Sequence, residues 1–106
     1  MKIAAVTACP TGIAHCELAA ERLERVAVER EIEIQVEIRG AAGASNELSE
    51  SEVREADVAI LAVDIDVDTG RFASVPTVQC STGDVIEDAD GVLERAIEQV
   101  NGTDSN

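Results

Sequence analysis

The residue best suited to chemistry is Cys9, which lies in the stretch Thr-Ala-Cys-Pro-Thr-Gly-Ile-Ala-His at residues 7–15. An apolar run at residues 3–6 precedes it, and a helical pattern begins near Ile13. Cys9 is therefore predicted to lie on a turn between a strand and a helix. The first amides of a helix have no partner inside the helix, and the helix dipole favours thiolate over thiol. Thiolate is the form that attacks phosphorus, so we expect Cys9 to accept a phosphoryl group.

The residues after Cys9 are suited to hold the three oxygens of that group. Backbone amides at the start of a helix bind phosphate. Gly12 lets the backbone approach closely, and Pro10, which lacks an amide, fixes the chain beside the nucleophile. The predicted phosphate-binding loop consists of Pro10, Thr11, Gly12, Ile13, Ala14 and His15.

For two further residues near Cys9, the sequence leaves two roles open in one case and predicts a packing role in the other. His15 is the only histidine; as a cation it would help to neutralise the phosphate, and otherwise it packs or caps at the start of the helix. Cys16 falls in the apolar stripe of that helix and is expected to be a small buried hydrophobic residue. A Cys9–Cys16 disulfide is not expected, because two helical turns separate residues by roughly 10 Å along the axis.

Alternating strands and helices must position this loop. Residues 32–38 alternate apolar and mostly acidic side chains, which predicts a strand with one wet face at the edge of a sheet. Ser49 and Glu52 form a predicted capping box. The predicted elements are strands at 2–7, 31–38, 57–63 and 75–80, helices at 13–30 and 49–55, a loop at 40–46 and a turn at 69–72. The stretch 83–100 ends in a last helix, which the acidic segment at residues 88–90 is expected to open.

This order predicts an α/β fold with a parallel sheet and right-handed crossovers. Ligands of such sheets bind at the carboxyl ends of the strands. Cys9, the loop at 40–46 and the acidic residues Asp64, Asp66 and Asp68 are expected to meet there. We expect one domain at residues 1–100 and a polar tail at 101–106.

Composition excludes some classes of function. The net charge of −14, from 22 acidic and 8 basic residues, disfavours nucleic-acid binding, which needs a basic face. It also favours a halophilic source, because molar salt screens such repulsion. No apolar run is long enough to span a bilayer and no signal peptide is evident, so we expect a cytoplasmic protein without membrane insertion.

Two other chemistries start from the same side chains. Low-molecular-weight tyrosine phosphatases have Arg six residues after their cysteine, but His15 stands at that position here. The guanidinium that clamps the transition state is thus missing, which disfavours hydrolysis. Asp64, Asp66 and Asp68 could form a metal site or carry a receiver-type phosphoaspartate. The metal site is disfavoured because the continuation of an EF-hand loop is missing. The phosphoaspartate is disfavoured because receiver domains need an acidic pair after the first strand, and that pair is missing. Loop capping and solvation explain the three aspartates better.

The stretch from Cys9 to His15 resembles the phosphorylation loop of the fructose-specific enzyme IIB domain of the sugar phosphotransferase system (PTS). The resemblance continues through residues 46–48, 56–62 and 64–72, and it covers residues 2–100. One departure is Cys16, which stands where the family usually has Thr.

The resemblance implies a three-layer, Rossmann-like domain with four parallel strands in the order 2-1-3-4. It also implies a phosphotransferase that carries phosphate on Cys9 as phosphocysteine. The donor would be a histidine-phosphorylated enzyme IIA, and the acceptor would be fructose bound by the membrane enzyme IIC, without a cofactor or metal. A regulatory module that senses phosphorylation or thiol state on the same fold is the alternative.

Overall fold

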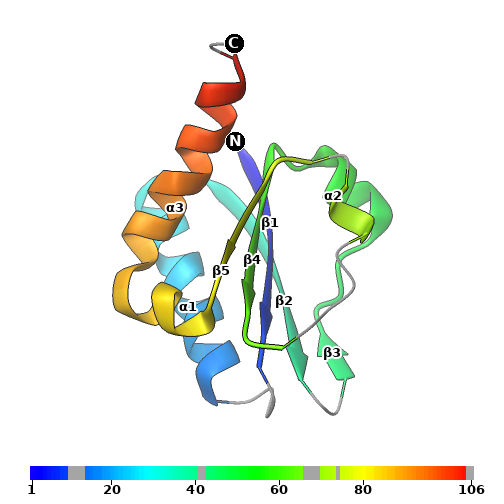
Figure 1. Ribbon diagram of the computed structural model, residues 1–106, viewed down its shortest axis with the longest axis vertical. Helices are drawn as coiled ribbons and strands as arrows, with labels where there is room; N and C mark the ends of the chain where they lie inside the picture. Colours follow the sequence, from blue (N-terminus) through cyan, green and yellow to red (C-terminus); the bar gives the residue numbers. More distant parts are fainter. Residues whose placement is uncertain (10–13, 41–42, 66–69, 74, 105–106) are drawn as a thin grey trace.

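The computed structural model describes residues 1–9, 14–40, 43–65, 70–73 and 75–104. The elements follow the predicted alternation, with one additional strand (Figure 1). They are β1 (Lys2–Ala8), α1 (Ala14–Glu29), β2 (Glu33–Gly40), β3 (Gly43–Ser45), α2 (Glu50–Glu55), β4 (Val58–Val63), η1 (Gly70–Phe72), β5 (Thr77–Cys80) and α3 (Thr82–Asp104).

The sheet is mixed and has five strands in the order β3-β2-β1-β4-β5. Strands β2, β1, β4 and β5 are parallel neighbours, whereas β3 pairs antiparallel with β2. The predicted four-stranded, purely parallel sheet is therefore wrong. The loop expected at residues 40–46 contains β3 instead, because the chain reverses and pairs Gly40 with Gly43. Gly43 has a φ of 130°, which side-chain-bearing residues rarely adopt.

This extra strand covers the carboxyl end of β2, whereas the first part of β2 keeps the edge position that the alternation predicted. Only the last residues of β2 pair with β3, from Ile38 to Gly40. Glu33 and Gln35 are exposed as expected, but Glu37 is fully buried. The alternating pattern was therefore misinterpreted at its carboxyl end.

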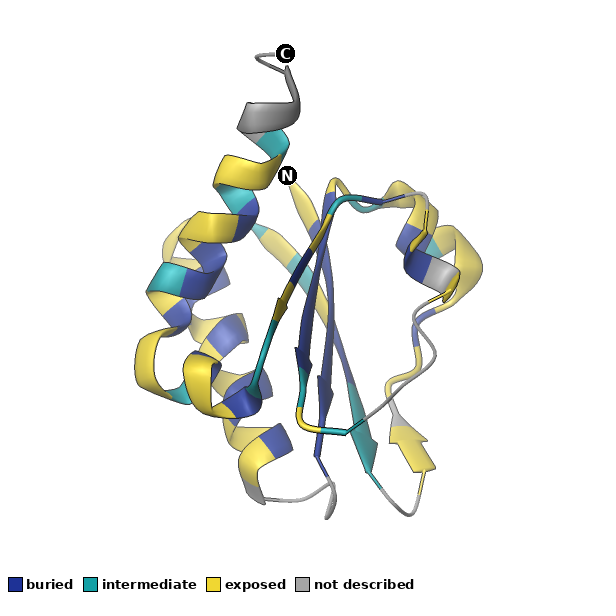
Figure 2. Ribbon diagram, in the orientation of Figure 1, coloured by how far each residue is buried: buried dark blue, intermediate teal, exposed yellow. Residues whose placement is uncertain are grey.

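Helices cover both faces of the sheet. Helices α1 and α3 lie on one face, and α2 with η1 lies on the other (Figure 1). Alternate residues of β1 point to opposite faces of the sheet. Ile3 and Ala5 pack in the cluster with α1 and α3, whereas Ala4 and Val6 pack in the cluster around α2. The central strands β1 and β4 are consequently buried over most of their length (Figure 2).

Helix α1 has the predicted amphipathic pattern. Its stripe of Cys16, Ala20, Leu23 and Ala27 is buried, and its glutamates face solvent. Ile13, expected to begin this stripe, lies outside the described residues. The small side chains allow α1 to pack closely against the sheet, in a core that contains one phenylalanine, Phe72, and no Trp or Tyr.

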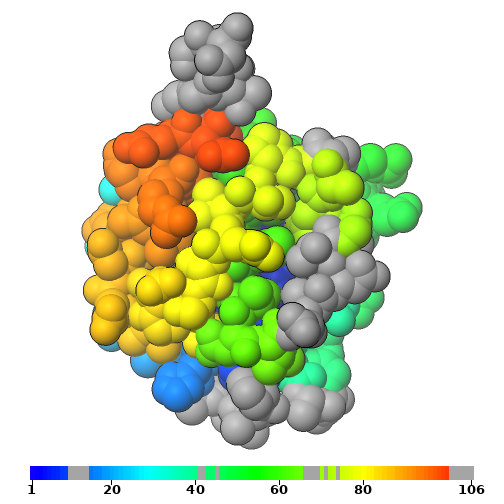
Figure 3. Space-filling view, in the orientation of Figure 1, coloured from blue at the N-terminus to red at the C-terminus, as the bar shows by residue number. Residues whose placement is uncertain are grey.

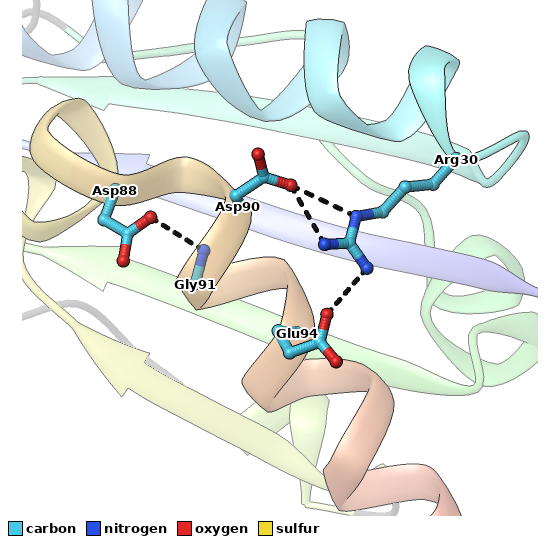
Figure 4. Close-up of polar contacts among 5 residues, drawn as sticks. All are labelled: Arg30, Asp88, Asp90, Gly91 and Glu94. Carbon is cyan, nitrogen blue, oxygen red and sulfur yellow. Dashed lines mark hydrogen bonds and ion pairs between the residues drawn. The ribbon is translucent and has the colours of Figure 1, made fainter.

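Helix α3 is longer than predicted and contains a kink. It begins at Thr82, where Ser81 and Asp84 exchange side-chain to backbone hydrogen bonds of 3.1 Å, and its backbone is helical to Asp104. Asp88 has non-helical angles (φ −153°, ψ 67°), and its carboxylate accepts from the Gly91 amide at 3.0 Å (Figure 4). The acidic segment at residues 88–90, predicted to open the helix, thus caps its second part.

Shorter elements agree with the sequence. Helix α2 begins after Ser49, and the predicted capping box with Glu52 is confirmed by hydrogen bonds of 3.0 and 3.2 Å.

An ion-pair cluster joins the two helices on the same face of the sheet. Arg30, which directly follows α1, forms ion pairs with Asp90 and Glu94 of α3 at 2.9 and 2.8 Å (Figure 4). Within the part of the chain described, no helix is both long and apolar enough to cross a membrane.

Candidate functional site

The carboxyl ends of three parallel strands are tied together around Cys9. Cys9 directly follows β1, and its amide donates to the carbonyl of Arg39 at the end of β2 at 3.3 Å. On the other side, the Asp64 amide, just after β4, donates to the carbonyl of Ala8 at 2.7 Å. Cys9 is therefore held at the centre of this edge, where the sequence placed it. The start of α1 and residues 64–65, which follow β4, reach the surface at this same end (Figure 3).

The first turn of α1 lies beside Cys9. The hydroxyl of Thr7, a fully buried residue, donates to the carbonyl of Cys16 at 3.1 Å. This bond fixes the start of the helix to the end of β1. The unpaired amides of a helix start and its dipole consequently act close to Cys9, which favours an anion there. Sequence analysis gave Thr7 no role, since an isolated threonine in an apolar strand carries no signal of its own.

The predicted phosphate-binding loop is described only in part. Pro10, Thr11, Gly12 and Ile13 lie outside the described residues. Ala14 is the first residue of α1, and His15 follows it with an exposed side chain. The structure therefore places the two ends of the loop, at Cys9 and at the first turn of α1.

Cys9 and Cys16 are joined by a disulfide, which corrects the expectation from the sequence. Their Cα atoms are 6.0 Å apart, within the range that a disulfide spans. The expectation failed because it measured the separation along one continuous helix. The helix begins only at Ala14, so Cys16 is in its first turn and Cys9 lies outside it. Cys16 is fully buried, as predicted, but it is also a covalent partner of Cys9.

An ion pair between a buried carboxylate and a half-buried guanidinium supports the end of β2, and sequence analysis missed it. The fully buried Glu37 carboxylate accepts from the guanidinium of Arg39 and from the amide of Leu48, the latter at 2.8 Å. The two charged residues are two positions apart, so their side chains lie on the same face of the strand. Because the carbonyl of Arg39 accepts from the amide of Cys9, this pair supports the backbone that holds Cys9 in place.

Of the three aspartates after β4, the structure describes Asp64. Its carboxylate accepts from the amide of Thr82 at 3.0 Å and from the Thr82 hydroxyl, so it ties the start of α3 to the end of β4. Asp66 and Asp68 lie outside the described residues. No cluster of His, Cys, Asp or Glu suited to a metal ion occurs among the residues that are described.

The third cysteine, Cys80, is a poor nucleophile. It ends β5 and carries a free thiol that is partly buried. Burial, reinforced by the nearby carboxylates of Asp84 and Asp64 and opposed by Arg95, raises the pKa of the Cys80 thiol to about 11. It is therefore protonated at neutral pH, the form in which a thiol does not act as a nucleophile.

Comparisons with known proteins agree with this geometry. The family model described as "PTS system, Lactose/Cellobiose specific IIB subunit" matches residues 4–95. The chain is 41% identical over 95 residues to the "PTS system fructose-like EIIB component 2" of Escherichia coli (strain K12), covering 89% of this chain and 90% of that protein. It is 43% identical over 96 residues to the "PTS system fructose-specific EIIB'BC component" of the same strain. That match covers 91% of the chain but only 17% of the longer protein.

Solved structures show the same similarity. A crystal structure of a predicted fructose-specific IIB from Escherichia coli superposes with a TM-score of 0.88 at 35% identity, over 93% of this chain and 88% of that one. A domain of the fructose-specific IIABC component of Borrelia burgdorferi gives a TM-score of 0.87 at 39% identity, over 92% and 93% of the two chains.

Proposed function

Because the chain belongs to the IIB family of the sugar phosphotransferase system, we propose that it is a phosphoryl carrier whose phosphate acceptor is Cys9. One observation carries the assignment of the residue: Cys9 directly follows the central strand β1 and lies beside the first turn of α1, where a helix start favours both thiolate and phosphate. The relatives favour this carrier over a phosphatase-like hydrolase and over a purely regulatory module.

The transfer consists of two substitutions at phosphorus. In the first, the Cys9 thiolate attacks the phosphorus of a phosphohistidine on enzyme IIA, so that a sulfur–phosphorus bond forms and the nitrogen–phosphorus bond breaks. In the second, a sugar hydroxyl attacks the same phosphorus, loses its proton and releases the thiolate. Such transfers depend on positioning and on stabilising charge. The residues proposed to do this are Pro10, Thr11, Gly12, Ile13, Ala14 and His15, with the start of α1.

The names of the relatives support fructose as the sugar. Under this proposal the donor is enzyme IIA, the acceptor is fructose held by the membrane enzyme IIC, and the product is fructose 1-phosphate inside the cell. The chain then acts in the cytoplasm. We assign the carrier domain to residues 1–100, which the family match at residues 4–95 supports.

The test is an intact-mass measurement. The reduced chain is incubated with phosphoenolpyruvate and the general PTS proteins, with IIA included, in dithiothreitol. Wild type and Cys80→Ser, which keeps Cys9, should each gain one phosphoryl group, and Cys9→Ser should gain none. Adding fructose and membranes with IIC should discharge the group. If IIA is phosphorylated in the same tube but the reduced wild type gains nothing, the proposal is wrong.

A further inference from the structure

We infer that Cys9 and Cys16 form a thiol switch, in which a reversible disulfide turns the phosphoryl acceptor off. The inference rests on the proposed function of Cys9 as that acceptor. It starts from the bond itself: the residue proposed as nucleophile is joined to a second cysteine one element away. A sulfur bonded to another sulfur has no thiolate electron pair with which to attack phosphorus.

The backbone holds both cysteines in position for this bond. Cys9 is tied to β2 through its amide and the carbonyl of Arg39 at 3.3 Å. Cys16 is tied to β1 through its carbonyl and the hydroxyl of Thr7 at 3.1 Å. With the Cα atoms 6.0 Å apart, the two side chains meet without movement of either element. The pairing therefore comes from the same packing that places the helix start beside Cys9.

In the disulfide state the sulfur of Cys9 is not accessible to a partner protein. In the reduced state the thiol of Cys16 has a hydrogen-bond acceptor. Cys9 is 1% exposed and Cys16 is fully buried in the bonded form. A phosphohistidine on another protein needs an accessible sulfur, so phosphoryl transfer requires both reduction and exposure of Cys9. When the bond is reduced, Cys16 keeps a partner: its sulfur lies 3.5 Å from the carbonyl oxygen of Arg39, to which a thiol can donate.

The redox step is balanced with a peroxide as oxidant. The Cys9 thiolate attacks one peroxide oxygen to give a sulfenic acid, and the other oxygen leaves as water after protonation. The Cys16 thiol then attacks the Cys9 sulfur, and the sulfenic oxygen leaves as a second water. Two thiols lose two electrons and two hydrogens, and the peroxide is reduced. A dithiol reverses the bond by exchange and becomes a disulfide itself.

In this scheme Cys16 also protects Cys9 from irreversible oxidation. A sulfenic acid with no neighbouring thiol is oxidised further to sulfinic acid, which is irreversible for most proteins. By resolving the sulfenic acid as a disulfide, Cys16 keeps the oxidation of Cys9 reversible. Cys80 does not share this role, because it ends β5 and has no disulfide partner in the structure.

The test treats wild type, Cys16→Ser, Cys16→Ala and Cys80→Ser with hydrogen peroxide and then with dithiothreitol. Small reagents are chosen because both cysteines are buried. Oxidised wild type and Cys80→Ser should lose two hydrogen atoms in mass and all phosphoryl uptake, and dithiothreitol should restore both. The Cys16 variants should take up phosphate when reduced. After peroxide they should gain two oxygen atoms at Cys9 and should not recover. Phosphorylation of wild type beforehand should protect it, since the sulfur–phosphorus bond occupies Cys9.

The outcomes separate the switch from the carrier. If reduced wild type takes up phosphate but peroxide forms no Cys9–Cys16 bond, or if the bonded form still takes up phosphate, the switch is wrong and the carrier stands. If reduced wild type takes up no phosphate beside phosphorylated IIA, the carrier is wrong and the switch falls with it. Full recovery of both Cys16 variants after peroxide contradicts the resolving role, and with it the switch.

Discussion

Single side chains around Cys9 differ in what they contribute to the site. Glu37 contributes by being buried: its carboxylate holds the Leu48 amide and the Arg39 guanidinium, and Arg39 in turn holds Cys9 through its carbonyl. A buried charge that loses its partners costs stability, and so does a buried amide that loses its acceptor. The backbone support of Cys9 therefore depends on one glutamate that sequence analysis assigned to a solvent-exposed face.

Replacing Glu37 should measure that support. Glu37→Ala removes the carboxylate that accepts from the Leu48 amide and from the Arg39 guanidinium, and we expect the free energy of unfolding to fall by about 2 kcal/mol. Glu37→Gln keeps an acceptor oxygen and should cost less. The matched control is Gln35→Ala on the same face of β2, where the side chain is exposed and a change within about 0.5 kcal/mol is expected. Urea unfolding curves give all three values, and a Glu37→Ala curve that matches the control contradicts this account.

Cys80 allows a test of the electrostatics at the end of β5. Its thiol pKa, raised to about 11 mainly by burial, predicts slow alkylation at neutral pH. In a Cys9→Ser/Cys16→Ser double variant, the rate of iodoacetamide labelling at Cys80 should rise about tenfold per pH unit up to pH about 11, as the thiolate fraction grows. A rate that levels off near pH 9, the ordinary value, would show that burial does not protect this thiol.

The sign of the effect on stability follows from the same shift. The pKa of Cys80 is higher in the folded chain than its ordinary value of 9.0. Between about pH 9 and pH 11 the unfolded chain therefore loses this proton while the folded chain keeps it, so the stability of wild type should fall with rising pH. Cys80→Ser lacks the titrating group and should lose less stability over this range, as thermal unfolding at a series of pH values will show.

At the scale of elements, helix starts are fixed by short polar signals. The Ser49–Glu52 box begins α2, Ser81 and Asp84 begin α3, and Asp88 begins the second part of α3 after the kink. Each satisfies amides that the helix cannot pair internally. These signals are local, so the sequence reveals them, whereas the joining of two helical segments into one bent α3 depends on their packing against the sheet.

Removing the cap at Asp88 should loosen the second part of α3. Asp88→Ala leaves the Gly91 amide without its carboxylate partner, and N-cap losses cost about 1 kcal/mol. Glu87→Ala, one residue earlier and also exposed, is the control and should change stability little. Hydrogen exchange should show faster exchange of amides after residue 88 in Asp88→Ala only. Equal exchange in the two variants would mean that the cap does not stabilise the helix.

Over the whole molecule, charge is strongly unbalanced. The net charge is −14, and the ion pairs on the exposed faces of the helices, such as Arg25 with Glu21, add little stability in water. Repulsion among the remaining carboxylates therefore acts on the folded state, where charges are closest.

Salt should stabilise the fold. Raising KCl from low to molar concentration shortens the screening length to about 3 Å, so we expect the melting temperature to rise by several degrees. A variant with Glu17→Gln, Glu24→Gln and Glu98→Gln removes three exposed charges and should show a smaller rise. Circular dichroism melts measure both. A melting temperature that is flat from low to molar salt contradicts the role of repulsion and removes the argument for a halophilic source.

The sequence by itself determined the parts that depend on local pattern. The apolar run before Cys9 and the helical stripe after it placed this cysteine between a strand and a helix, because strand and helix periods are properties of neighbouring residues. The same holds for the amphipathic face of α1 and the capping box at Ser49. These features carried the resemblance to the family and the choice of Cys9.

Only the tertiary structure decided what long-range packing controls. Cys16 meets Cys9 because α1 begins only at Ala14, so the two cysteines do not lie on one continuous helix, and a separation in sequence does not report where a helix begins. Glu37 is buried because the segment at Leu48 and the guanidinium of Arg39 close over it, although its place in the alternating pattern faces water. Strand β3 forms because Gly43 allows the reversal and β2 offers an unpaired edge. In each case the deciding contact lies between segments that a local pattern cannot connect.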